Sequence, residues 1–131
     1  MIFYTADLHF HYEPFLPSRP FGSVEEMDRV LTEAKALGTH ACLFTGGEPL
    51  LRKKDIIRLC EKHRDMAFHA FTNGTLIDED FCQEMLRVGN FFVSISVEGF
   101  EEANDGRRGR GHFQKAVSYT HLRAHETRRH L

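Results

Sequence analysis

The stretch Leu43-Phe44-Thr45-Gly46-Gly47-Glu48-Pro49-Leu50 decides the fold of this chain. A short apolar run stops abruptly at two glycines, and a lone carboxylate and a proline follow them. Paired glycines allow the main chain to adopt positive φ and to approach a ligand closely, while Pro49 fixes the path by which the chain leaves the strand. On turn chemistry alone, the pattern fits either a ligand-binding strand end or a strand followed by an ordinary tight turn.

The same pattern occurs twice more at a near-constant spacing. Apolar runs at residues 66–71 and 91–97 end in Thr72-Asn73-Gly74-Thr75 and in Glu98-Gly99, and amphipathic segments of helical length separate the runs. A repeated unit of strand and helix predicts an α/β fold with parallel strands and crossover helices. The carboxyl ends of such strands meet at one edge, where binding sites occur. We therefore expect one site formed by all three strand ends.

Local signals place the individual elements. Ser23 and Glu26 form a capping box ahead of an apolar stripe that ends at Gly38, and Asp78 and Gly89 bracket a later helix. The expected helices are residues 23–37, 53–63 and 78–88, and the expected strands are residues 39–45, 66–72 and 91–97.

The composition fits one globular domain, since 41% of the 131 residues are hydrophobic and 27% are charged. The sequence has no apolar run of about eighteen residues and no recognisable signal peptide, so we expect no membrane partner and a cytoplasmic location. Cys42, Cys60 and Cys82 are widely spaced in apolar contexts, without a CxxC or CxxxC pair. We interpret them as buried structural thiols.

Four motifs together carry a resemblance to a known family. They are Thr45-Gly46-Gly47-Glu48-Pro49-Leu50, Thr72-Asn73-Gly74-Thr75-Leu76-Ile77, Ser94-Ile95-Ser96-Val97-Glu98-Gly99 and Asp105-Gly106-Arg107-Arg108-Gly109. In this order and spacing, residues 33–116 resemble the core of the radical S-adenosylmethionine (SAM) enzymes, most closely members that modify peptides or small molecules. The resemblance implies a partial (βα) barrel of the TIM type, with SAM and a [4Fe–4S] cluster as cofactors.

The resemblance also implies a role for each matched residue. Gly46, Gly47 and Glu48 would receive the α-ammonium group of SAM, with Pro49 completing that motif, and Asn73 would lie beside the cofactor. Ser96 and Glu98 would face the ribose hydroxyls, although Glu98 stands where the family usually has aspartate. Arg108 would pair with the methionine carboxylate. Independently of the resemblance, two arginines between glycines fit either an anion site or a solvated basic loop.

One family feature is missing from the sequence. The family holds its cluster with three thiolates of a CxxxCxxC loop, which leave one iron open to SAM. This sequence contains no such loop, and Cys42 is a lone thiol on an expected strand. We therefore expect a chain that does not cleave SAM reductively to the 5′-deoxyadenosyl radical. A non-catalytic SAM-binding remnant is the alternative within the same family.

The segment before the core resembles a second family. Phe3-Tyr4-Thr5-Ala6-Asp7-Leu8-His9-Phe10 and residues 19–28 are similar to the start of the calcineurin-like metallophosphoesterases. That resemblance implies that Asp7 and His9 are metal ligands, and an exposed loop pair is the alternative. The later motifs of that family are absent, and two ligands do not make a two-metal site. A metallophosphoesterase fragment is the competing hypothesis for the function.

The charge of the chain is uneven. Before Arg107 there are 10 basic and 18 acidic residues, and from Arg107 onward there are 7 basic and 1 acidic. Such a tail suggests nucleic-acid binding, but residues 117–127 resemble a translated transposase adapter from library preparation. We therefore expect no nucleic-acid partner and no metal pair at His121 and His125. The chain is interpreted as composite: residues 1–32, residues 33–116, and a non-native or disordered tail, 117–131.

Overall fold

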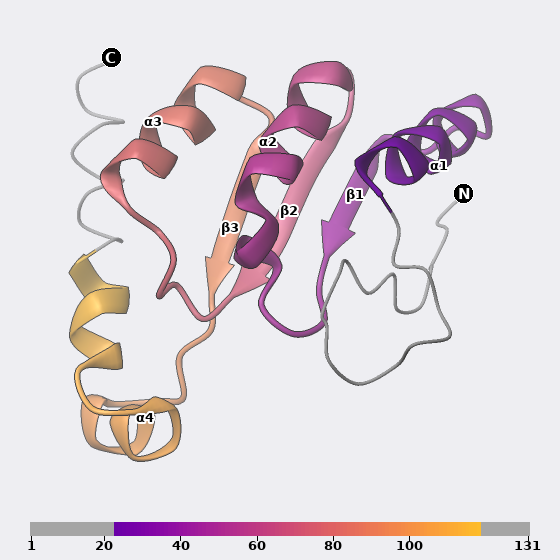
Figure 1. Ribbon diagram of the computed structural model, residues 1–131. Coiled ribbons are helices and arrows are strands. Elements are labelled where there is room, and N and C mark those ends of the chain that lie inside the picture. Colours follow the sequence, from indigo (N-terminus) through magenta and orange to yellow (C-terminus); the bar gives the residue numbers. More distant parts are fainter. Residues whose placement is uncertain (1–22, 119–131) are drawn as a thin grey trace.

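The computed structural model describes residues 23–118 (Figure 1). Helices and strands alternate along this part of the chain, as the repeated pattern predicts. The elements are α1 (Val24–Ala36), β1 (Ala41–Phe44), the 3-10 helix η1 (Pro49–Arg52), α2 (Lys53–Lys62), β2 (Ala67–Thr72), α3 (Glu79–Val88), β3 (Phe91–Ile95) and α4 (Glu101–Arg108), and residues 112–118 are again helical. Each of the six expected elements is present, and no end differs from its predicted position by more than two residues.

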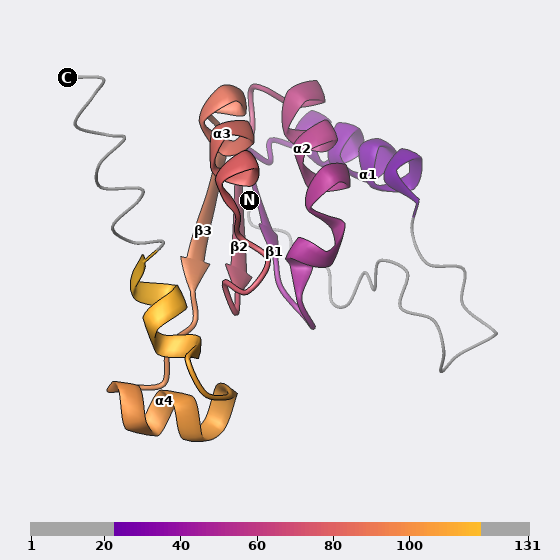
Figure 2. The ribbon, with the colours of Figure 1, turned by 60° about the vertical axis from the view of Figure 1, so that its left-hand side comes forward.

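The three strands form a parallel sheet in the order β1-β2-β3. Leu43 pairs with His69, and His69 pairs with Phe92, so the three strands run in register toward one edge. Helices α2 and α3 are the crossovers, and both lie on the same face of the sheet (Figures 1 and 2). A parallel sheet with crossover helices is the predicted α/β architecture, and it is consistent with part of a (βα) barrel.

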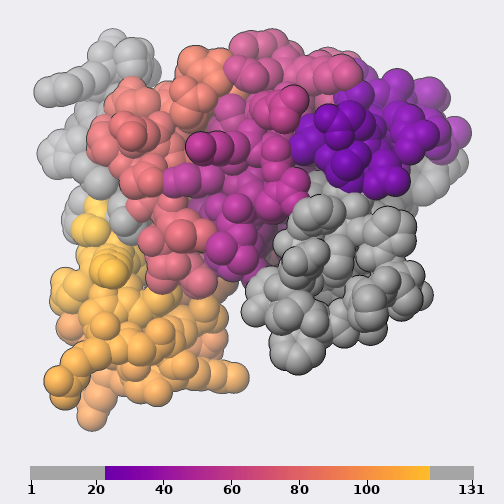
Figure 3. Space-filling model, viewed as in Figure 1, coloured from indigo at the N-terminus to yellow at the C-terminus, as the bar shows by residue number. Residues whose placement is uncertain are grey.

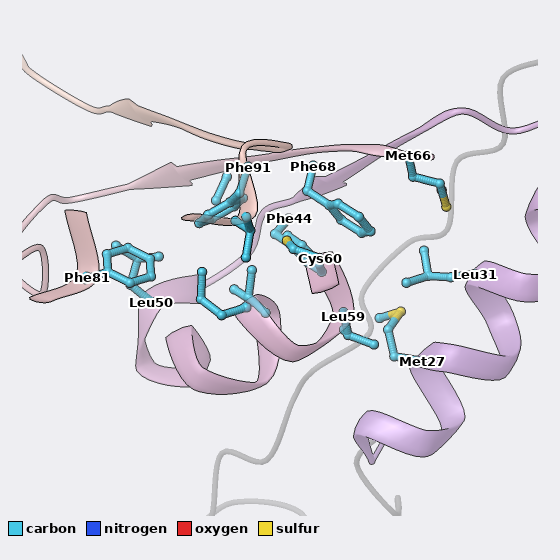
Figure 4. Packing of buried hydrophobic residues seen from close by; sticks show 14 of the residues in the cluster. Met27, Leu31, Phe44, Leu50, Leu59, Cys60, Met66, Phe68, Phe81 and Phe91 are labelled. Atoms are coloured by element: carbon cyan, nitrogen blue, oxygen red, sulfur yellow. The ribbon is translucent and has the colours of Figure 1, made fainter. Parts of the chain in front are cut away.

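The core lies between this face of the sheet and the helices (Figure 4). Phe68 and Ala70 of β2 are completely buried there, and the ring of Phe68 stacks on that of Phe44 with centroids 6.0 Å apart. Met27 and Leu31 bring α1 into the same cluster. On the other face Leu43, Phe71 and Phe92 are about half exposed, so only one face of the sheet is covered by described residues.

The helix ends follow the local signals in the sequence. Both hydrogen bonds of the capping box at the start of α1 are present, between Ser23 and Glu26. The Asp78 carboxylate caps α3 by accepting from the Phe81 N–H at 2.8 Å. Gly89 ends α3 in the left-handed conformation at φ 73°, where a side chain is disfavoured. Among residues 23–118, no helix has the length and apolar character needed to cross a membrane.

Residues 101–111 are expected to form either an anion site or a solvated basic loop, and their structure rules out the loop. The solvated basic loop is wrong, because Glu101–Arg108 form α4. Glu101 and Glu102 lie in its first turn and Arg107 and Arg108 in its last, which places each charge near the helix end that favours it. Helix α4 and residues 112–118 project beyond the helices α2 and α3, at the edge toward which the strands point (Figures 1 and 3).

Candidate site at the carboxyl edge of the sheet

The end of β1 is tied to the end of β2 by the carboxylate of Glu48. Its Oε1 accepts hydrogen bonds from the Thr72 hydroxyl at 2.6 Å and from the Leu50 N–H at 3.0 Å. Its Oε2 accepts from the Asn73 N–H at 2.8 Å. Glu48 also caps η1, in which Pro49 is the first residue. A carboxylate has about four acceptor positions, so three are used here and one is left for a further donor.

The turn after β2 is held by its own side chains. The Thr72 hydroxyl accepts from the Gly74 N–H at 3.0 Å, and the Asn73 side-chain oxygen accepts from both the N–H and the hydroxyl of Thr75. Gly74 has φ 78°, and a Cβ there would lie 3.0 Å from a methyl carbon of Ile95. Glycine is required at this turn because the backbone conformation and the contact with β3 both exclude a side chain.

The segment that follows β3 completes the edge. The Ser96 N–H donates to the Thr72 carbonyl oxygen at 2.8 Å, which places Ser96 next to the end of β2. Glu98 is paired with Arg108 at 2.6 Å and with Arg107 at 3.3 Å. The hydrogen bond from Arg108, and then the charge of Arg107, hold the pKa of Glu98 below its ordinary value. Within the described residues, the buried Nε of Arg108 has no hydrogen-bond partner.

The two glycines after β1 leave the main chain uncovered. Gly46 has φ 108°, a conformation that L side chains rarely adopt, and a Cβ built on either Gly46 or Gly47 would meet no atom of the described residues within 4 Å. Both residues are exposed. Packing against the described residues therefore does not explain the glycine pair. The described residues leave the space beside the pair open to a molecule that approaches the backbone.

A group of buried polar side chains lies under the same edge. Asn104 of α4 is completely buried and His112 is 5% exposed, and the Nδ2 of Asn104 lies 3.0 Å from the Nδ1 of His112. The Nε2 of His112 lies 2.7 Å from the carbonyl oxygen of Asn73, and the Asn104 side-chain oxygen accepts from the Glu98 N–H at 3.0 Å. Sequence reasoning missed both residues, because neither belongs to a motif whose partners are near in sequence.

The predicted site residues therefore come together, and one feature differs from expectation. Hydrogen bonds connect Glu48 to both Asn73 and Thr72, and Thr72 to Ser96. A second path runs from Asn73 through His112 and Asn104 to Glu98. Glu98 is in turn bonded to Arg108. Glu98 and Arg108, expected to face different parts of a ligand, pair with each other. Asp7 and His9, the expected metal ligands, lie outside the described residues.

Comparison with known proteins decides the family. The model of the Radical SAM superfamily matches residues 7–129, which is most of the chain. The chain belongs to the radical SAM superfamily. This agrees with the parallel sheet, the crossover helices and the glycine-marked strand ends.

Several characterised radical SAM proteins are similar to this chain. The Fe-coproporphyrin III synthase of Methanosarcina barkeri is 36% identical over 102 residues, covering 76% of this chain and 25% of the relative. The PqqA peptide cyclase of Granulibacter bethesdensis is 32% identical over 87 residues, covering 65% and 23%. A GTP 3′,8-cyclase of Clostridium botulinum is 35% identical over 81 residues, covering 60% and 25%. The chain thus spans about a quarter of the length of these relatives.

Family membership implies SAM and a [4Fe–4S] cluster, and the thiols of this chain do not fit the cluster. The sequence has three cysteines and no CxxxCxxC loop. Burial raises the pKa of Cys60 to about 12 and that of Cys42 to about 11, so neither is a ready thiolate. Among residues 23–118, no three His, Cys, Asp or Glu side chains are grouped to hold a metal ion.

Proposed function

We propose that this chain binds SAM at the carboxyl edge of its sheet, as the nucleotide-binding part of a radical SAM core. The observation that carries the proposal is the convergence of Glu48, Asn73, Ser96, Glu98 and Arg108 on one edge. Hydrogen bonds connect them there, either directly or through Thr72, His112 and Asn104. These polar residues come from three strand ends and one helix. A polar ligand that spans the strand ends accounts for them.

Each of three polar parts of the proposed ligand meets a complementary group of the chain. The α-ammonium group lies over Gly46 and Gly47 and donates to the one acceptor position that Glu48 has left. Ser96 and Glu98 accept from the ribose hydroxyls, and Asn73 lies beside the nucleotide. The methionine carboxylate pairs with the guanidinium group of Arg108, whose side chain is 26% exposed and also pairs with Glu98.

We further propose that the chain as it stands binds SAM without cleaving it. The cluster supplies the electron for reductive cleavage in this family, and the three cysteines of this chain do not fit it. The residues described above bind and orient the nucleotide, and they perform no redox step. The choice between a peptide and a small molecule as substrate belongs to the parts of such a protein that lie outside this chain.

Equilibrium dialysis with radiolabelled SAM tests the binding, and two arginine variants make a matched pair. Arg108→Gln removes a charge at the proposed site, while Arg87→Gln removes one from α3, where Arg87 pairs with Glu61 and Glu84. We expect Arg108→Gln to raise the Kd about tenfold, equivalent to about 1.4 kcal/mol, and Arg87→Gln to leave it unchanged. Failure of the wild-type chain to bind SAM, or equal effects of the two variants, contradicts the proposal.

Anaerobic reconstitution with iron and sulfide tests the proposed lack of cleavage. We expect no cluster absorption and no 5′-deoxyadenosine when SAM and a strong reductant are added. Product formation would overturn the second proposal without affecting the first, since SAM binding is measured separately.

We also propose that the chain is composite, with a metallophosphoesterase-like segment at 1–32 and a non-native tail at 117–131 that begins with the adapter-like residues 117–127. The support is the sequence resemblance at each end. The family match extends from residue 7 to residue 129, across both proposed junctions, and does not favour them. Amplification and independent sequencing of the source DNA test the hypothesis. A single continuous reading frame through residues 1–131 would contradict it.

A further inference from the structure

His112 occupies an unusual position for a histidine. It opens the helical segment 112–118, and its ring lies buried between α4 and the turn after β2. Its two ring nitrogens contact two different elements, the main chain of Asn73 on one side and the side chain of Asn104 on the other. A buried imidazole that is bonded on both sides fixes the distance between the groups it joins.

The partners of the ring indicate which of its nitrogens carries the hydrogen. The carbonyl oxygen of Asn73 only accepts hydrogen bonds, so Nε2 carries the hydrogen and donates to it at 2.7 Å. The Asn104 oxygen already accepts from the Glu98 N–H, which leaves its NH₂ group to donate to Nδ1. Three hydrogen bonds therefore point the same way, from Glu98 through Asn104 and His112 to Asn73, and only the neutral Nε2–H tautomer allows this.

This chain of hydrogen bonds joins two parts of the proposed SAM site. Asn73 follows β2 and Glu98 follows β3, and His112 and Asn104 bridge the two segments beneath the edge. The carboxylate of Asp105 holds the start of the segment 112–118 by accepting from the N–H groups of Gly111 and Phe113 at 2.5 and 2.9 Å. The position of the imidazole is thus set independently of any ligand.

We propose that His112 is a positioning residue of the SAM site. Its neutral imidazole holds the turn at Asn73 and the segment at Glu98 in the relative placement in which both face one nucleotide. This inference rests on the proposed SAM binding. His112 acts through the main chain of Asn73 and through Asn104, and it is not itself a contact of the nucleotide.

Two substitutions separate the hydrogen bonds from the volume of the side chain. Glutamine at 112 offers an N–H donor and an oxygen acceptor about as far apart as the two ring nitrogens, so His112→Gln can restore both bonds. His112→Leu fills the space and restores neither, which leaves the Asn73 carbonyl and the Asn104 amide unpaired. Val88→Ala is the control for lost stability, because Val88 is buried at the end of α3, at the opposite edge of the sheet.

The experiment measures the Kd for SAM and the thermal midpoint of all four proteins. We expect His112→Leu to raise the Kd about tenfold, His112→Gln to stay within about threefold of the wild type, and Val88→Ala to lower the midpoint with the Kd unchanged. A Kd for His112→Leu equal to that of the wild type overturns the inference. So does an equal rise in Val88→Ala, since a loss of stability would then explain both.

The ¹⁵N spectrum of the His112 ring tests the inference without SAM. A hydrogen on Nε2 and none on Nδ1 gives two well-separated nitrogen resonances, and slow exchange of the Glu98 N–H reports its bond to Asn104. We expect both in the unliganded wild-type chain. A ring protonated at Nδ1, or an unprotected Glu98 amide, overturns the positioning role. If the wild type shows both signals and binds no SAM, the proposed function fails and the inference about the site fails with it, whereas His112 remains a bridge in the fold.

Discussion

The hydroxyl of Thr72 donates to the Glu48 carboxylate at 2.6 Å and accepts from the Gly74 N–H at 3.0 Å. One buried hydroxyl therefore fixes the end of β1 against the end of β2 and also closes the turn that follows β2. Because Thr72 is only 2% exposed, water does not replace these bonds when the hydroxyl is removed.

Thr72→Val keeps the shape of the side chain and removes the hydroxyl. We expect the free energy of unfolding to fall by about 1–3 kcal/mol, because the Gly74 N–H loses its partner and Glu48 loses one donor. Urea denaturation followed by circular dichroism measures the change. Thr72→Ser keeps the hydroxyl, so its free energy of unfolding should fall distinctly less. Equal falls in the two variants would contradict the role given to the hydroxyl.

Alanine substitutions at Gly89 and Gly106 are expected to change the stability in opposite directions. Gly89→Ala forces a side chain to φ 73° at the end of α3, and we expect a loss of about 1 kcal/mol from backbone strain alone, since no atom of the described residues is closer than 3.9 Å to the new Cβ. Gly106 lies inside α4, and a Cβ there would meet no atom of residues 23–118 within 4 Å, so Gly106→Ala should stabilise by about 0.5–1 kcal/mol. Thermal denaturation of both variants tests whether the two changes in stability have opposite signs. A stabilising Gly89→Ala would contradict the left-handed end of α3.

Sequence reasoning predicted the parts of this fold whose causes are local. The capping box of Ser23 and Glu26 spans three residues, and the end of α3 at Gly89 depends on one backbone angle. Such signals are complete within one turn of the chain, so the helices and strands follow from them. The parallel order also follows, because each strand is joined to the next by a single crossover helix.

The parts that sequence reasoning missed depend on partners distant in the chain. His112 meets Asn73 across 39 positions, and Glu48 meets Thr72 across 24. Nothing near His112 in the sequence signals these contacts, and the glycines and arginines around it are typical of a loop. Helix α4 contains one of these glycines, the exposed Gly106, and its buried residue Asn104 accepts from the Glu98 N–H. The motifs predicted which residues gather at the edge and did not predict how they pair.

Asn90 makes a third prediction, at the opposite edge of the sheet. Its side-chain NH₂ lies within 3.0–3.1 Å of the carbonyl oxygens of Cys60, His63 and Met66, so it holds the turn between α2 and β2. The NH₂ group has two hydrogens, so the three contacts amount to about two hydrogen bonds, and Asn90→Ala should cost about 2 kcal/mol at roughly 1 kcal/mol per bond. Asn90→Asp should cost more, since a carboxylate then faces three carbonyl oxygens. Urea denaturation tests the order of stability of the two variants. An aspartate variant more stable than the alanine variant would contradict these contacts.

Asp105 gives the stability a dependence on pH. The N–H groups of Phe113 and Gly111 hold the pKa of its carboxyl below the ordinary value of 3.8. Because the folded-state pKa is the lower one, the stabilisation is complete above the unfolded value and is lost as the pH falls through the folded value. Asp105→Asn should therefore be less stable than the wild type near neutral pH, and the difference between the two should shrink on acidification.

Urea midpoints at about pH 7 and about pH 3 measure that difference, since the two values lie on either side of the ordinary carboxyl pKa. Glu102→Gln is the matched control, because it neutralises an exposed carboxylate on the same helix. We expect its pH dependence to follow that of the wild type. If Asp105→Asn instead loses the same stability at both pH values, the effect comes from the shape of the side chain. That result would contradict the role given to the charge of Asp105, which is to hold the start of the segment 112–118 and so to place the His112 ring beside Asn73.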